Sequence, residues 1–177
     1  PGNPNVLLAS VDLGVHFTHP DLRNNIWQNL NEDADGDGQT IQYSGGQWIL
    51  DPGDLNGIDD DDWDNNPNTF IDDLIGWDHS GINGVDDNNP APPSNNSWSH
   101  GTHVAGLLAS TTDNNTGIAS TAFNCSILPV KCTADNEDNQ YISNGYEGIL
   151  YAAQAGYNAE GFIIINCSWG GMGSNIF

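Results

Sequence analysis

Three short apolar runs constrain the fold of this chain more than any other feature. They cover residues 6–11, 126–131 and 162–167, and two segments with helical periodicity, 101–110 and 143–155, lie between them. Runs that are apolar throughout are typical of strands buried on both faces of a parallel sheet. The order strand–helix–strand–helix–strand therefore predicts an α/β fold with right-handed crossovers and helices on both faces of the sheet.

The charge of the chain is strongly unbalanced. The 177 residues include 24 acidic and 2 basic side chains, which give a formal net charge of −22. Nucleic acids and anionic membrane surfaces bind to cationic faces, and no apolar run approaches the ~20 residues that span a bilayer. We therefore expect neither a nucleic acid nor a membrane as partner, whereas so many carboxylates favour hard cations.

A long acidic insertion separates the first strand from the first helix. It covers about 30–97, is rich in Asn, Gly and Pro, and 15 of the 24 acids lie between Asp33 and Asp87. Trp48, Trp63 and Trp77 lie within it, and aromatic side chains are scarce in disordered segments. A segment of this length is either functional or disordered, and the tryptophans favour an ordered insertion.

One part of the insertion has the spacing of a calcium loop. Asp33, Asp35 and Asp37 alternate with small residues, as in the first half of an EF-hand loop, but the twelfth position is Ser44 and not Glu. Four consecutive aspartates at 59–62 repel one another unless a cation or water neutralises them. These patterns predict structural Ca²⁺, and the alternative is a solvated acidic surface.

An acid and a histidine occupy positions suited to catalysis. Asp12 follows the first strand, at the sheet edge where sites form in α/β proteins, and His100 begins the first helical segment. A carboxylate that accepts from one imidazole nitrogen orients the ring, so that the other nitrogen acts as a base. A zinc hydrolase that uses His100 and His103 is an alternative, because positions i and i+3 share a helix face, although no third ligand is evident.

Four motifs follow one another along the chain: Val11-Asp12-Leu13-Gly14-Val15, His19-Pro20-Asp21-Leu22, His100-Gly101-Thr102-His103-Val104-Ala105-Gly106 and Ile165-Asn166-Cys167-Ser168-Trp169-Gly170-Gly171. Together they resemble the subtilisin-like serine proteases (subtilases, peptidase S8 family). The resemblance implies a three-layer α/β fold with a parallel sheet, and hydrolysis of peptide bonds by an Asp–His–Ser triad. It implies that Asp12 orients the general base His100. It also implies that Ser168, Trp169 and Gly170 bind an extended polypeptide substrate.

Two departures from the family pattern bear on activity. Leu13 stands where the family has Thr or Ser, and the 177 residues contain neither the Gly-Thr-Ser nucleophile motif nor the oxyanion Asn that follows it. We therefore expect 1–177 to be a partial peptidase domain, inactive by itself, with its nucleophile downstream. Ser99, Ser168 and Ser174 are local alternatives without the expected context. The rival function is a non-catalytic, calcium-stabilised pseudoprotease or binding module.

The resemblance also extends the candidate calcium ligands. Segments 57–62 and 70–73 resemble a metal-binding segment of many subtilases, and 78–88 precedes the histidine motif where some relatives hold another calcium. The ligands that this adds are Asp59, Asp61, Asp72, Asp78 and Asp86. Calcium loops, an acidic surface and the habit of the family together suggest a secreted or extracellular protein.

Overall fold

The core of the molecule is a four-stranded parallel sheet. The computed structural model describes residues 1–61, 63, 65–66, 69–93, 98–136, 141–159 and 161–170. The strand order is β4–β5–β1–β6, where β1 is Val6–Asp12, β4 is Trp77–Asp78, β5 is Ser126–Lys131 and β6 is Phe162–Asn166. The three predicted strands are confirmed. The short strand β4 comes from the insertion and was not predicted.

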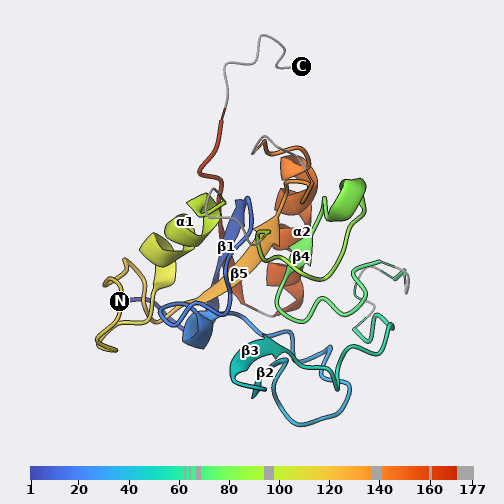
Figure 1. Cartoon of the computed structure of the whole chain (residues 1–177), viewed down its shortest axis with the longest axis horizontal. Coiled ribbons are helices and arrows are strands. Elements are labelled where there is room, and N and C mark those ends of the chain that lie inside the picture. Colours follow the sequence, from blue (N-terminus) through green and yellow to red (C-terminus); the bar gives the residue numbers. More distant parts are fainter. Residues whose placement is uncertain are drawn as a thin grey trace.

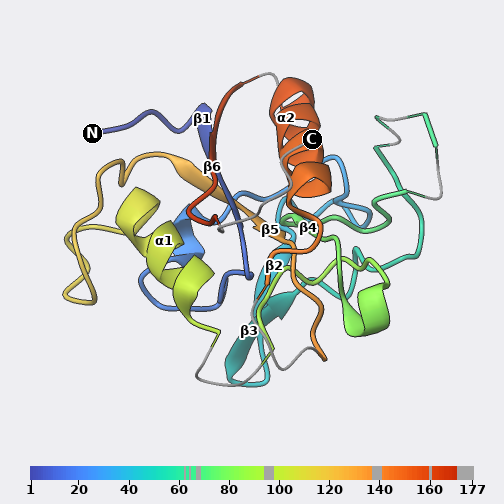
Figure 2. The ribbon, with the colours of Figure 1, turned by 90° about the horizontal axis from the view of Figure 1, so that it is seen from above.

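Two helices cover opposite faces of this sheet. Side chains of β1 alternate between the faces: Leu8 packs in one core cluster with Ala105 of α1 (His100–Ala109), and Ala9 packs in another with Ala152 of α2 (Gly145–Asn158). Figures 1 and 2 show the two helices on either side of the strands. The predicted α/β fold is therefore confirmed, and both faces are covered at β1. At β6 the prediction of a strand buried on both faces is wrong, because Phe162 and Ile164 are exposed. Neither helix of the described part is long and apolar enough to cross a membrane.

The acidic insertion packs against both cores. Its antiparallel hairpin, β2 (Ile41–Ser44) and β3 (Gln47–Leu50), lies beyond one end of the parallel sheet in Figure 1. Short 3₁₀ turns occur at Arg23–Asn25, just before the insertion, and at Ile82–Gly84 within it. The residues that anchor the insertion in the core on the α1 side are Ile41, Trp48, Leu50, Leu74 and Ile75, and those on the α2 side are Trp63, Phe70 and Trp77.

Candidate active site

Asp12 and His100 meet at the carboxyl end of β1. The Asp12 carboxylate is buried, and its Oδ1 lies 2.8 Å from Nδ1 of the half-exposed His100 ring at the start of α1. The same oxygen accepts a hydrogen bond from the Leu13 backbone N–H at 2.7 Å. Because Nδ1 is engaged by the carboxylate, Nε2 is the ring nitrogen that is left to take a proton from a substrate or nucleophile.

Two glycines allow this close approach. A Cβ atom on Gly101 would lie 2.4 Å from the carbonyl oxygen of Gly14 and 3.1 Å from Oδ1 of Asp12. Gly14 has a φ of +103°, and a Cβ atom there would lie 2.8 Å from the carbonyl oxygen of Pro90. Gly101 therefore lets the first turn of α1 pack directly against the turn after β1, and at position 14 only glycine combines that backbone conformation with the close approach of Pro90.

The pair lies in a cleft of about 640 Å³. The residues that line the cleft are Asp12, Leu13, His100, Tyr141, Ile142, Ser168, Trp169 and Gly170. All five residues that were predicted for catalysis and substrate binding are thus gathered at one cavity. Tyr141 and Ile142 were not singled out from the sequence, because they precede the second helix without any motif.

Trp169 fixes the cleft segment that follows β6. Its indole Nε1–H donates to the carbonyl oxygen of Val11 at 2.7 Å, and its ring lies against Gly145, where a Cβ atom would be 2.7 Å from the ring. The Asn166 side-chain amide donates to the hydroxyl of Ser168 at 2.9 Å. The space beside Gly170 is open. The segment is therefore tied to β1 and α2 and remains open on one side.

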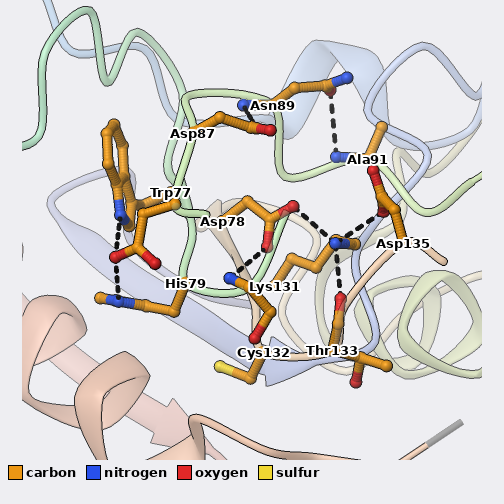
Figure 3. A network of polar contacts seen from close by, with 12 residues as sticks. Trp77, Asp78, His79, Asp87, Asn89, Ala91, Lys131, Cys132, Thr133 and Asp135 are labelled. Atoms are coloured by element: carbon orange, nitrogen blue, oxygen red, sulfur yellow. Dashed lines mark hydrogen bonds and ion pairs between the residues drawn. The ribbon is translucent and has the colours of Figure 1, made fainter. Parts of the chain in front are cut away.

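The strand beside β1, β5, ends in a buried ammonium group. Lys131 at the end of β5 is fully buried, and its Nζ lies 2.5 Å from Oδ2 of Asp78 and 2.8 Å from Oδ1 of Asp135 (Figure 3). It also donates to the carbonyl oxygen of Thr133 at 2.7 Å. Burial raises the pKa of Asp78 to about 6, although the Lys131 charge opposes the shift. Asp78, a predicted calcium ligand, is therefore paired with an ammonium group.

Asp86 contacts the side chains of His79 and Trp77. Its Oδ2 is 3.5 Å from Nδ1 of His79 and accepts from the Trp77 indole N–H at 3.5 Å. Burial lowers the pKa of His79, an effect that the Asp86 charge opposes. The structure does not group Asp86 with the other predicted metal ligands.

The predicted calcium loop brings its acids together. Carboxylate oxygens of Asp33, Asp35 and Asp37 lie within 4.8 Å of one another. Asp33 accepts from the backbone N–H groups of Gly36 and Gly38, both at 2.8 Å, and Asp35 accepts from the N–H of Asp37 at 3.0 Å. The three oxygens are thus close enough to contact one ion.

A second group of acids was only partly predicted. Oxygens of Glu32, Asp61 and Asp73 also lie within 4.8 Å of one another, and of these only Asp61 was a candidate from the sequence. Asp73 lies in segment 70–73, which resembles a metal-binding segment of the family, although it was not named as a ligand. Glu32 follows no metal-loop spacing, so no sequence signal distinguishes it from other acids. The two groups show that acidic clusters of the described chain could hold cations.

The remaining predicted ligands, Asp59 and Asp72, are buried but belong to neither group. Oδ1 of Asp72 accepts from the backbone N–H groups of Asn56 and Gly57, both at 3.1 Å. Burial raises the pKa of Asp72. Asp62 and Ser174, which belong to the predicted acidic run and to the alternative nucleophiles, lie outside the described residues.

Comparisons with known proteins show which proteins this sequence is similar to. The profile of the Subtilase family matches residues 3–175. An extracellular protease of Xanthomonas campestris pv. campestris is 30% identical over 173 residues, which cover 95% of this chain and 25% of that protein. Thermitase of Thermoactinomyces vulgaris is 39% identical over 100 residues, which cover 56% of this chain and 31% of thermitase. A thermophilic serine proteinase of Bacillus sp. (strain AK1) is 45% identical over 71 residues, 40% of this chain and 16% of the relative.

The chain belongs to the subtilase family of serine peptidases, as the four sequence motifs predicted. It spans about a quarter of the first of these relatives and less than a third of the second. The family implies hydrolysis of polypeptides. Within the described residues, the acid and histidine groupings that could hold a metal include neither His100 nor His103, so the zinc alternative gains no support.

Proposed function

We propose that this chain supplies the orienting aspartate and the general base of a serine endopeptidase. The observation that carries the proposal is the 2.8 Å contact between buried Asp12 and His100 at the rim of a cleft. In the proposed mechanism, Nε2 of His100 takes the proton from a serine hydroxyl as its oxygen attacks the peptide carbonyl carbon. His100 then gives that proton to the leaving amine. A water molecule then gives a proton to His100 as it attacks the carbonyl carbon of the acyl-enzyme, and His100 returns that proton to the serine oxygen as the acyl group is released.

Asp12 acts in this mechanism as an orienting carboxylate. It accepts from Nδ1, which keeps Nε2 unprotonated for the serine and stabilises the imidazolium that forms during the reaction. It receives the Leu13 N–H on the same oxygen, and Leu13 provides no side-chain hydroxyl to that carboxylate. The nucleophile belongs to the Gly-Thr-Ser motif that the family carries and that the 177 residues do not contain.

The proposed substrate is a polypeptide in an extended conformation. Residues 168–170 lie along the cleft, where their backbone can pair with a peptide strand, and Tyr141, Ile142 and Trp169 provide apolar surface for its side chains. A net charge of −22 makes nucleic acids and anionic membranes unsuitable partners.

The proposal includes calcium in the acidic insertion and export from the cell. Asp33, Asp35 and Asp37 provide only oxygen ligands on one loop, which suits Ca²⁺, and an ion that binds the folded form stabilises it by mass action. The Xanthomonas relative is named an extracellular protease, and this name supports a secreted protein.

The test is hydrolysis of a chromogenic peptide by the full-length protein. His100→Ala should lower kcat by about 10⁴-fold or more, because the base is lost. His103→Ala is the matched control, since His103 lies on the same helix, does not line the cleft and is exposed. Equal activity of the two variants would contradict the proposal. A full-length protein that binds peptides but does not cleave them would favour the pseudoprotease instead.

A further inference from the structure

Thr133 connects the end of β5 to a residue that lines the cleft. It follows Lys131, the last residue of β5, by two positions and is 0% exposed. Its hydroxyl donates a hydrogen bond to the carbonyl oxygen of Tyr141 at 2.8 Å. Tyr141 lines the cleft and is 66% exposed. A buried side chain therefore holds the backbone of a residue whose own side chain faces the cleft.

The backbone of Thr133 is itself fixed by the buried ammonium group of Lys131. Nζ of Lys131 donates to the carbonyl oxygen of Thr133 at 2.7 Å (Figure 3). The same group forms ion pairs with Asp78 of β4 and with Asp135. The backbone N–H of Asp135 donates to the carbonyl oxygen of Gly81 at 2.9 Å. Because a buried network of paired polar groups is rigid, Thr133 has a defined position from which its hydroxyl can donate.

Ile142, the next residue of the cleft, is held from two sides. Ser143, directly after it, donates to the carbonyl oxygen of Cys132 through its backbone N–H at 2.9 Å and through its hydroxyl at 3.2 Å. The Ile142 side chain packs with the core on the α2 side. A Cβ atom on Gly145 would lie 2.7 Å from both the Ile142 side chain and the ring of Trp169. Close packing therefore fixes Ile142 in the cleft wall.

Tyr141 is held less firmly by packing. It belongs to neither core cluster of the described residues and is mostly exposed. A side chain that buries little apolar surface gains little free energy from its surroundings, so its place in the cleft depends on the backbone that carries it. The hydrogen bond from Thr133 acts on that backbone.

We propose that Thr133 is a positioning residue for peptide binding, which acts by holding Tyr141 in the wall of the cleft. This inference rests on the proposed function, because it takes a polypeptide as the ligand of the cleft. When a contact residue is not held in place beforehand, part of the binding free energy is used to order it. Loss of the Thr133 hydroxyl should therefore weaken peptide binding and leave the proton transfers at His100 unchanged.

The test measures steady-state hydrolysis of a chromogenic peptide by variants of the full-length protein. Thr133→Val retains the shape of the side chain without the hydroxyl, so KM should rise at least about threefold while kcat stays within about twofold of the parent. Thr133→Ser retains a hydroxyl and should restore most of the lost affinity. In a Tyr141→Ala background, Thr133→Val should no longer raise KM, because the residue that it acts through is gone.

Thr40→Val is the matched control. Thr40 is also 0% exposed, and its hydroxyl donates to the carbonyl oxygen of Leu74 at 2.7 Å, but it does not line the cleft. Each valine variant leaves a carbonyl oxygen without its hydroxyl partner, so both should melt at a slightly lower temperature than the parent. Only Thr133→Val should change KM. An equal rise of KM in both variants, or an unchanged KM in Thr133→Val, would overturn the proposal.

Peptide binding in a His100→Ala background separates this inference from the proposed function. The Kd of a fluorescent peptide, measured by anisotropy, should be at least about threefold higher for Thr133→Val than for Thr133→Ser. A parent that binds the peptide without cleaving it would contradict the peptidase activity alone, and the Kd difference would still support the role of Thr133. A parent that neither binds nor cleaves it would contradict both. Should Thr133→Val fail to fold, Thr133→Ala provides the same comparisons.

Discussion

The carboxylate of Asp12 and the ring of His100, which are 88 positions apart in sequence, are in contact at 2.8 Å. β1 ends at the first of these residues and α1 begins at the second. Asp12 is 1% exposed, whereas the His100 side chain is 50% exposed. The acid is therefore shielded from water while the base faces the cleft, which is the arrangement that an orienting carboxylate and a general base require.

Replacing the orienting acid should remove most of the activity without removing the fold. Asp12→Asn retains the size of the side chain but favours the wrong tautomer of His100, so kcat should fall by about 10⁴-fold. Steady-state kinetics on the full-length protein measure the effect, with Asp113→Asn on an exposed loop as the control. A loss smaller than about tenfold would contradict the role of Asp12.

The close approach of α1 to β1 should depend on Gly101. Alanine there would place its Cβ atom 2.4 Å from the Gly14 carbonyl oxygen, and the structure would have to move Asp12 away from His100. Gly101→Ala should cost about 1–3 kcal/mol of unfolding free energy and most of kcat. Gly106→Ala in the same helix is the control, because its nearest atom is the Ser110 hydroxyl at 3.4 Å. Equal effects of the two substitutions would refute this account of the packing.

The buried Lys131 should be essential to stability at neutral pH. Lys131→Met leaves the Asp78 carboxylate buried without its ammonium partner, a change that typically costs about 3–5 kcal/mol. Burial already raises the Asp78 pKa to about 6 in the folded protein, and loss of the ammonium raises it further. Below about pH 6 the folded parent and the folded variant both keep Asp78 protonated, so the loss caused by the substitution should grow only as the pH rises above about 6, where the parent ionises Asp78 beside Lys131 and the variant does not.

Urea unfolding at pH 5 and pH 7 measures this effect. The loss should be smaller at pH 5, where Asp78 is protonated in the variant. The double variant Lys131→Met/Asp78→Asn should recover part of the stability at pH 7, because it no longer buries a lone charge. A loss that is identical at both pH values would show that Lys131 acts through packing alone.

Tyr141 should contribute to peptide binding and not to folding. It lines the cleft and is 66% exposed, so Tyr141→Ala should raise KM several-fold and leave the melting temperature unchanged. Tyr146→Ala is the matched control, since Tyr146 is 73% exposed on α2 and does not line the cleft. Equal KM values for the two variants would contradict a role of Tyr141 in peptide binding.

The regular part of the fold could be predicted from the sequence, because strands buried on both faces are apolar throughout and helices between them have their own period. The hairpin β2–β3 and the short strand β4 could not, since they lie in a segment rich in Asp and Gly with no clear periodicity. Lys131 was predicted only as the end of a strand. Its burial depends on Asp78, which comes from a distant segment.

The candidate site, too, could be predicted only in part from the sequence. Asp12 and His100 stand at the ends of predicted elements, but it was the resemblance to the subtilases that implied their pairing. Glu32 was missed because it lies 29 positions before Asp61 and outside any metal-loop spacing, and only tertiary packing brings it to Asp61 and Asp73. The regular spacing of the Asp33–Asp35–Asp37 loop, in contrast, is visible in the sequence itself.

The most direct measurement of the central claim is covalent labelling of the full-length protein with a fluorophosphonate, followed by mass spectrometry of the labelled peptide. We predict that one serine in a Gly-Thr-Ser motif is labelled, and that His100→Ala abolishes labelling while His103→Ala does not. Labelling that persists without His100, or that falls on Ser99 or Ser168, would contradict the assignment of Asp12 and His100 as the catalytic pair.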